Sequence, residues 1–244
     1  GPICESSDTF GVYKNYSILK EGDYVCITNC GAYGRTLSSN YNMRPLIEEV
    51  ILNNKNFKIK IRQKVIEKIK NSVPSAIISV DTRKSMVAEK ALQAGATIVN
   101  DISAGSFDKK MFEVVAKHGA GICLMHSRGL PENMQNMPYY DDILLDIYDY
   151  FEEKIAEAQS KGIPREKIVI DPGIGFGKNL HHNLEIINKI SLFLGLGLPV
   201  MIGVSRKSFI GEIISERDPS ERLTGSVVAM LASLNRGVNR SEEH

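Results

Sequence analysis

The chain has 244 residues, a formal net charge of +1, 43% hydrophobic residues and 24% charged residues. These values are typical of a soluble globular protein with one or two domains. The near-zero charge gives no electrostatic reason to expect nucleic acid or a membrane surface as a partner. Because no apolar run approaches the length of a membrane span and no signal peptide opens the sequence, we expect a cytoplasmic protein.

The four cysteines do not predict a metal site. They are Cys4, Cys26, Cys30 and Cys123. Cys26 and Cys30 are four residues apart on an expected strand and therefore share a face, but a structural metal site needs a second pair of ligands, which the neighbouring sequence lacks. We interpret all four as buried or free thiols in a reducing compartment, and we predict no metal ligand.

Residues 1–62 predict a small, mainly antiparallel β segment. Short apolar runs alternate with turn signals, and the run from Phe57 to Ile61 alternates apolar and basic residues cleanly. Alternation of this kind is typical of a strand with one buried face. The other expected strands are residues 16–19, 24–27 and 50–52. A segment of this size is small for an independent hydrophobic core.

Four motifs in residues 1–62 resemble the C-terminal β domain of diaminopimelate decarboxylase. They are Gly1–Ser6, Glu21–Asp23, Gly31–Gly34 and Ser38–Pro45. The resemblance implies that Cys4 and Glu5 reach a partner subunit's active site and that Tyr33 helps to hold pyridoxal phosphate. That cofactor's chemistry needs a Schiff-base lysine on a barrel domain, which this chain lacks ahead of the segment. We therefore favour a β segment without function over decarboxylase activity, and we expect no pyridoxal phosphate.

From about Gln63 onward, expected strands alternate with expected helices. The strands are residues 75–81, 96–101, 121–126, 168–171 and 199–205, and helices are expected at 64–71, 85–94, 109–118, 141–160, 184–193 and 221–236. Such alternation predicts a parallel α/β arrangement. Polar residues stand where the strands end, and they are Asp81, Asn100, Asp101, His126, Asp171, Ser205 and Lys207. The carboxyl ends of parallel strands converge on one face, so this face is the candidate site.

The fourth expected strand leads into an unusual glycine-rich run, Asp171–Lys178. Pro172 holds Asp171 in an extended conformation, and glycines at 173, 175 and 177 let backbone N–H groups approach a ligand. The run does not match a nucleotide-binding P-loop or a G-x-G-x-x-G fingerprint. By itself it fits either a ligand site for hydrogen-bond donors or a tight turn with a capping Asp.

Five motifs within residues 64–238 resemble dihydropteroate synthase. They are Val80–Lys84, Gly95–Ser103, Leu124–Gln135, Asp171–Lys178 and Gly203–Gly211. The resemblance implies an incomplete (β/α)8 barrel, with the β segment of residues 1–62 as one domain and residues 63–244 as a pterin-binding domain. It also implies a transferase of folate synthesis that joins p-aminobenzoate to hydroxymethyl-dihydropterin diphosphate, with pterin and p-aminobenzoate as small-molecule partners and a homodimer as a possible assembly.

The same resemblance implies roles for six residues. Asp81, Asn100, Asp171 and Lys207 would line the pterin pocket, and Phe176 and Ser208 would lie toward the aminobenzoate. Carboxylates accept hydrogen bonds from the N–H groups of a pterin, and a lysine donates to its carbonyl. Lys207 and Asp81 are the candidate catalytic residues, and we expect Lys207 to lower the pKa of Asp171.

The histidines at two places in the sequence could have either a structural or a functional role. His126 could be a general base or a ligand, but a packed histidine at a strand end is the favoured alternative. His181 and His182 begin an expected polar helix and are interpreted as solvated.

Parts of the family pattern are missing from the sequence. We find no first strand, whose Asn holds Mg²⁺ and diphosphate in the family, no second strand, and no last strand beyond residue 238. The resemblance therefore implies Mg²⁺ but not its ligand. We expect a truncated fusion with impaired transferase activity, and the alternative is a non-catalytic pterin-binding remnant or fusion fragment.

Overall fold

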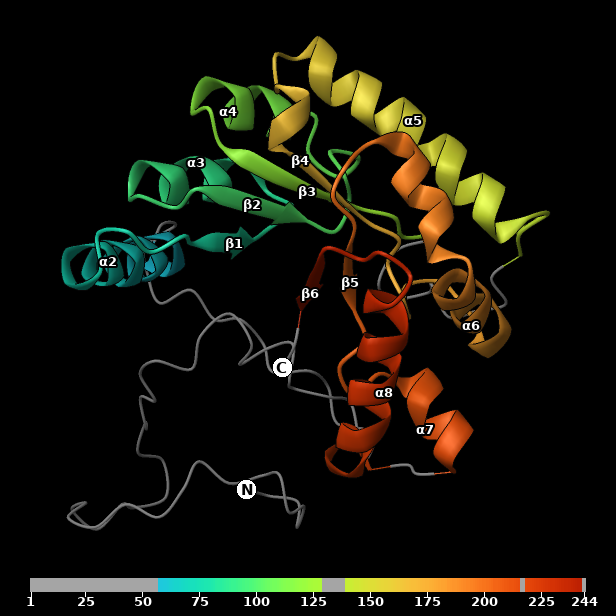
Figure 1. Ribbon diagram of the computed structural model, residues 1–244. Helices are drawn as coiled ribbons and strands as arrows, with labels where there is room; N and C mark the ends of the chain where they lie inside the picture. Colours follow the sequence, from blue (N-terminus) through green and yellow to red (C-terminus); the bar gives the residue numbers. More distant parts are fainter. Residues whose placement is uncertain (1–56, 129–138, 216–217, 243–244) are drawn as a thin grey trace, which may run out of the picture. The chain divides into compact units, whose positions relative to one another are not determined.

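The chain alternates between parallel strands and helices, as Figure 1 shows for the computed structural model. Residues 57–128, 139–215 and 218–242 are described. The helices are α2 (Phe57–Ser72), α3 (Ser85–Gln93), α4 (Met111–Lys117), α5 (Ile143–Ser160), α6 (Leu180–Asn188), α7 (Ser208–Ile214) and α8 (Leu223–Leu234). The strands are β1 (Ser79–Asp81), β2 (Ile98–Asp101), β3 (Gly121–Met125), β4 (Ile168–Asp171), β5 (Met201–Gly203) and β6 (Arg240–Glu242).

Several sequence-based predictions lie outside the described residues. They concern Cys4, Glu5, Tyr33, the other residues up to 56, and the loop of residues 129–138. The described residues belong to one compact unit, Asn56–His244. Within the described residues, no helix is both long and apolar enough to cross a membrane.

The strands follow one another in chain order. β1, β2, β3 and β4 form a parallel sheet, and β5 pairs in parallel with β6. A parallel bridge between Ile170 and Val200 continues the order from β4 toward β5, where the Ile170 N–H donates to the Pro199 carbonyl at 3.1 Å. The parallel α/β arrangement predicted from the sequence is confirmed.

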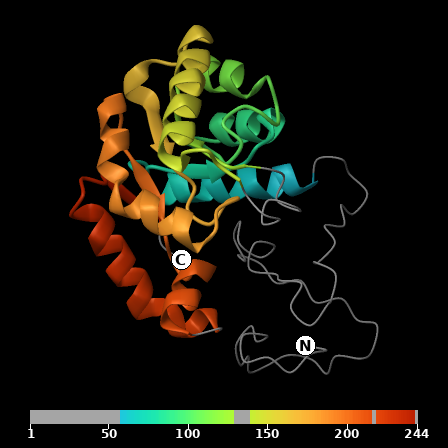
Figure 2. The ribbon, with the colours of Figure 1, turned by 90° about the vertical axis from the view of Figure 1, so that its right-hand side faces the viewer.

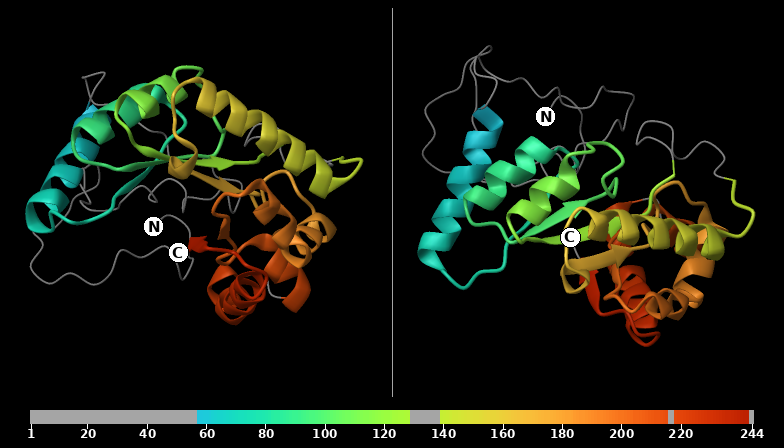
Figure 3. Two further views of the ribbon diagram at one scale, coloured as in Figure 1. Left: turned by 45° about the horizontal axis from the view of Figure 1, so that its top comes forward. Right: turned by 90° about the horizontal axis from the view of Figure 1, so that it is seen from above.

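One face of the sheet carries the hydrophobic core. Val80, Val99, Ile122 and Ile168 are in register across the four strands and are at most 7% exposed. Figure 3 shows α3, α4 and α5 along this face, and α8 packs on α6 and α7 (Figure 2). Each fully buried isoleucine contributes about 1.5–3 kcal/mol to folding. The core therefore fixes the positions of the strand ends.

The predicted strand at Phe57–Ile61 is wrong, because these residues begin helix α2. The run alternates over five residues, but the apolar positions Val65, Ile66 and Ile69 then follow at helical spacing. Ile66 is 5% exposed, and α2 packs on α3. Tertiary packing of a helical stripe outweighs the short alternation, and α2 spans the predicted domain boundary at residue 62.

Strand β6 is a strand that the sequence does not predict. Arg240, Ser241 and Glu242 pair in parallel with β5 although all three are polar. The Arg240 N–H donates to the Val200 carbonyl, and Asn239 Oδ1 accepts from the Val200 N–H at 3.1 Å. Backbone pairing needs no apolar side chain, so a search for apolar runs misses such a strand.

Candidate functional site

The polar strand ends divide between the two faces of the sheet. Asp81, Asn100 and Cys123 form one row across β1, β2 and β3, and Asp171 lies on the same face of β4. Asp101 lies on the opposite face, where its carboxylate accepts from the backbone of Ser103 and Gly105 within its own turn. Asp81, Asn100 and Asp171 therefore lie on one face of the sheet, and Asp101 lies on the other.

Asn100 presents a buried acceptor on this face. Its side chain is 8% exposed, and its Nδ2 donates to Asp81 Oδ1 at 3.1 Å. That bond fixes the amide so that Oδ1 faces away from Asp81. Among the described residues, Oδ1 has no hydrogen-bond partner. A buried acceptor without a donor costs about 1–3 kcal/mol, so the position is suited to a ligand N–H group.

Asp171 connects β4 to the glycine-rich loop. Its carboxylate is 4% exposed and accepts from the Gly173 N–H at 2.8 Å. Gly173, Gly175 and Gly177 all have φ between +64° and +81°. A Cβ at Gly173 would overlap the carbonyl oxygen of His126, and one at Gly177 would overlap that of Arg128. The loop is thus pressed against the backbone that follows β3, and glycine permits this approach.

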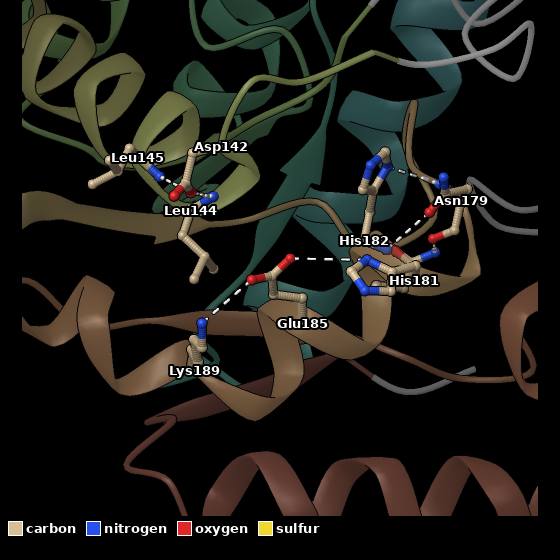
Figure 4. A network of polar contacts seen from close by, with 9 residues as sticks. Asp142, Leu144, Leu145, Asn179, His181, His182, Glu185 and Lys189 are labelled. Atoms are coloured by element: carbon tan, nitrogen blue, oxygen red, sulfur yellow. Dashed lines mark hydrogen bonds and ion pairs between the residues drawn. The ribbon is translucent and has the colours of Figure 1, made fainter.

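Helix α6 anchors the same loop from its other end. Asn183 Oδ1 accepts from the Gly175 N–H at 2.8 Å, and Asn183 Nδ2 donates to the Asn179 carbonyl at 2.8 Å. Asn179 and His182 form a capping box at the start of α6 (Figure 4). His181 is exposed and lies 3.9 Å from Glu185, which also pairs with Lys189. The prediction of two solvated histidines therefore holds for His181, and His182 has a capping role.

Lys207 follows β5, and its side chain contacts the glycine-rich loop. Its Nζ donates to the Ile174 carbonyl at 2.5 Å and lies 4.4 Å from the centre of the Phe176 ring. The structure thus brings together Lys207 and Phe176, as it does Asp81 and Asn100. Ser208 is exposed and begins α7, directly after Lys207.

Lys207 lowers the pKa of Asp171, as predicted, but the net pKa of this carboxyl group is raised. Burial raises the pKa of this carboxyl group above its ordinary value. The charge of Lys207 does lower the pKa, as do the Gly173 N–H and the charge of Lys178, but desolvation is the larger effect. The sequence identified the neighbouring cation and could not show how completely the carboxylate is buried.

His126 is packed, which agrees with the favoured alternative. It is 6% exposed, and its ring meets the edge of Tyr150 at 4.9 Å between ring centres. Burial lowers the pKa of His126 to about 2, with further lowering by the charges of Lys178 and Arg128. The imidazole is therefore neutral. Tyr140 and Tyr150, the aromatic neighbours of His126, were not predicted, because no short motif links them to the end of β3.

The site residues do not fit the Mg²⁺ that the family resemblance implies. In residues 57–128, 139–215 and 218–242, no group of three His, Cys, Asp or Glu side chains could hold a metal ion. Asp81 accepts a hydrogen bond from Asn100, and Asp171 accepts one from the Gly173 N–H of its own loop. We therefore assign no metal ligand and derive no chemical step through a metal.

A surface hollow lies apart from these residues. It has a volume of about 500 Å³ and lies between α6 and α8. Its lining includes His181, Ile187, Lys189, Ala232 and Arg236, and none of the predicted site residues. The candidate site is instead the largely buried, polar group of side chains at the strand ends.

The chain is similar to dihydropteroate synthases in sequence and in fold. The chain is 43% identical over 149 residues to the dihydropteroate synthase of Synechocystis, covering 61% of this chain and 52% of that protein. The dihydropteroate synthase structure from Stenotrophomonas maltophilia, with imidazole in its active site, matches with a TM-score of 0.74 and 32% identity, covering 78% of this chain and 71% of that one. The Thermus thermophilus enzyme in complex with 6HMPPP matches with a TM-score of 0.69 and 37% identity, covering 74% and 70%.

The matches cover only part of this chain and part of each relative. The chain spans about half the length of the curated Synechocystis relative. The solved relatives agree with the described arrangement of parallel strands and helices as an incomplete (β/α)8 barrel. The sequence model of the family described as pterin binding enzymes matches residues 59–241. Since this match covers most of the chain, the protein belongs to the pterin-binding enzyme family, in which its similar relatives are dihydropteroate synthases.

Proposed function

We propose that this chain recognises the pterin substrate of a dihydropteroate synthase reaction and takes part in that transfer. The observation that carries the proposal is the buried Asn100 Oδ1, which has no partner among the described residues and lies on the same sheet face as Asp81 and Asp171. A pterin presents N–H donors beside a carbonyl. Such an edge complements this group of acceptors, with Lys207 as a donor to the carbonyl.

The proposed roles follow the chemistry of each side chain. Asp171 and Asn100 accept from the amino-pyrimidinone edge of the pterin, and Asp81 holds Asn100 in position. Phe176 and Ser208 border the p-aminobenzoate. The solved Thermus thermophilus relatives carry 6HMPPP in one structure and 4-aminobenzoate in another, which supports the same two ligand classes here.

The proposed reaction needs no nucleophile from the protein. The bond between the pterin methylene and the diphosphate oxygen breaks, and diphosphate leaves with the electron pair. The amine of p-aminobenzoate then forms a C–N bond to the methylene and loses one proton. The carboxylates of Asp81 and Asp171 would stabilise positive charge on the pterin, so catalysis here consists of positioning and charge stabilisation. A turnover assay with both substrates separates this transfer from the alternative of pterin binding without turnover.

The test of pterin recognition is Asn100→Ala. We expect affinity for 6-hydroxymethylpterin to fall roughly 2- to 13-fold, the ratio that corresponds to about 0.5–1.5 kcal/mol for a neutral hydrogen bond. Isothermal titration calorimetry gives the dissociation constant. Asn71→Ala, an exposed asparagine on α2, is the control and should leave it unchanged. Equal affinities in the wild type and Asn100→Ala would refute the assigned acceptor.

We also infer that α8 forms the contact of a homodimer. One face of α8 exposes Leu223, Val227, Val228, Leu231 and Leu234 by 39–60% of their surfaces. The recurrence of these residues at helical intervals makes a continuous apolar stripe, and helices of soluble proteins seldom expose such a stripe to water. A second copy of α8, related by twofold symmetry, would present the same stripe and cover it.

Val228→Asp tests this contact. We expect the dimer dissociation constant to rise about tenfold or more, because two unpaired carboxylates would be buried at a symmetric interface. Light scattering after size-exclusion chromatography measures the dimer fraction over a dilution series. Met86→Asp on α3 is the matched control, since Met86 is 55% exposed and Val228 60%. A monomeric wild-type chain would rule out the homodimer.

A further inference from the structure

Lys178 is a buried lysine that has none of the roles proposed above. Its side chain is 3% exposed. Its Nζ lies 3.0 Å from His126 Nδ1, 3.3 Å from the His126 carbonyl oxygen and 3.0 Å from the Phe176 carbonyl oxygen. An ammonium group has three N–H donors, and these neighbours supply three acceptors. Every donor of Lys178 therefore has a partner.

The neutral state of His126 determines which protonation state of Lys178 fits. With the pKa of His126 lowered to about 2, its Nδ1 can accept a hydrogen bond from Lys178. A neutral amine would offer two N–H groups to the same three acceptors, and one buried acceptor would lose its donor. The complete set of contacts therefore requires Lys178 to be charged.

The contacts of Lys178 join two loops. His126 follows β3, whereas Phe176 belongs to the glycine-rich loop after β4. Tyr140 joins the same segments, since its hydroxyl donates to the Gly177 carbonyl at 2.9 Å and its ring lies 6.1 Å from that of His126. The loop they hold carries the Ile174 carbonyl, which accepts from Lys207. Lys178 thus fixes the backbone against which Lys207 is placed.

Lys178 also acts electrostatically on Asp171. Burial lowers the pKa of Lys178 to about 7, the charge of Asp171 acts in the opposite direction, and Lys207 lowers it further. Conversely, the charge of Lys178 is among the effects that lower the pKa of Asp171 against burial. Each buried group therefore favours the ionised form of the other. Asp171, His182 and Lys207 interact electrostatically with Lys178, and Arg128 acts on the neighbouring His126. The rings of Tyr140 and Tyr150 lie against that of His126.

We propose that Lys178 is a positioning residue for pterin recognition, which holds the glycine-rich loop against the end of β3 and so places Asp171 and Lys207 for the ligand. The inference rests on the proposed function, since that function gives Asp171 its ligand. Lys178 itself makes no contact with the pterin in this scheme. Its contribution is the geometry of the loop and the charge state of Asp171.

The test compares the wild type with Lys178→Met, which keeps the length of the side chain and removes its charge and donors. In the ligand-free chain, we expect the Asp171 carboxyl group of Lys178→Met to titrate at higher pH, as followed by carbon NMR of labelled aspartate. Affinity for 6-hydroxymethylpterin at pH 6.5 should fall about tenfold or more, because the loop that carries Asp171 loses the charge-assisted hydrogen bonds of Lys178. Lys178→Arg retains the charge and should restore most of both properties.

Lys154→Met is the matched control. Lys154 is also buried, at 6% exposed, but it pairs with Glu157 at 2.7 Å on α5. Its replacement should leave the Asp171 titration and the pterin affinity unchanged. An Asp171 titration and a pterin affinity that are both the same in the wild type and in Lys178→Met would overturn the proposal.

A measurement on the wild type covers the case in which Lys178→Met does not fold. Nitrogen NMR of labelled lysine should show Lys178 losing its proton near pH 7, because burial lowers its pKa to about 7. A Lys178 that loses its proton only near the ordinary lysine pKa of about 10.4 would contradict its burial against the loop. If the wild-type chain binds no pterin, the proposed function fails, whereas the ligand-free titrations still decide whether Lys178 controls the charge of Asp171.

Discussion

Asp171→Asn should weaken the binding of 6-hydroxymethylpterin roughly 10- to 150-fold, corresponding to about 1.5–3 kcal/mol for hydrogen bonds to a charged group. The carboxylate offers acceptors only, whereas the amide would turn N–H groups toward the N–H donors of the pterin. Asn can still accept from the Gly173 N–H, which Asp171 now does at 2.8 Å. The loop should therefore keep its conformation while the ligand is lost. Calorimetry at pH 7.5 measures the difference.

The same substitution should leave the folded state at least as stable as the wild type. Burial raises the pKa of Asp171, so the folded protein disfavours the charged form. A raised carboxyl pKa reduces stability at pH values above the pKa of the unfolded chain, and this penalty is lost in Asp171→Asn. We expect its midpoint of thermal unfolding at pH 7.5 to equal or exceed that of the wild type. Weaker binding can then be assigned to recognition and not to unfolding.

Asp149→Asn is the control for binding, because Asp149 is an exposed carboxylate on α5. It should leave the pterin dissociation constant unchanged. Unaltered affinity in Asp171→Asn would mean that Asp171 caps its own turn and contacts no ligand. That result would favour the alternative in which the glycine-rich run is only a tight turn with a capping Asp.

Gly173→Ala should destabilise the fold by roughly 2–5 kcal/mol. The left-handed φ of +68° costs an alanine about 1–2 kcal/mol, and overpacking costs about 1–3 kcal/mol more. The added Cβ would overlap the carbonyl oxygen of His126, which is backbone and cannot rotate away. Relief requires the loop to move, so pterin affinity should fall as well. Urea denaturation followed by circular dichroism measures the free energy of unfolding.

Gly119→Ala separates the conformational cost of a left-handed φ from the cost of overpacking. Gly119 has a similar φ of +59°, but a Cβ there would meet no atom within 4 Å. This variant should therefore lose only the conformational contribution, about 1–2 kcal/mol, and retain pterin affinity. The difference between the two variants measures the close approach of the loop to β3. Equal losses in both variants would show that the contact with His126 is dispensable.

The local sequence pattern predicts most of the helices and strands, but it fails for the start of α2 and for β6. The parallel strands were predictable because β-branched runs alternate with helical stripes, and the resemblance to dihydropteroate synthase added their order. Phe57–Ile61 was assigned to a strand because five alternating residues carry no information about the helix that continues to Ser72. β6 was missed because its pairing with β5 uses backbone groups beneath polar side chains.

The sequence by itself determined which residues stand at the strand ends, since chain order and hydrophobic pattern place Asp81, Asn100 and Asp171 there. It could not determine which face each side chain occupies. Asn100 and Asp101 are adjacent, yet strand pleating turns Asn100 toward the site and Asp101 into its own turn. The burial of Lys178 depends on the tertiary structure, because its partner His126 lies 52 residues away along the chain. The physical reason is that desolvation and paired charge depend on packing between distant segments, which no local pattern encodes.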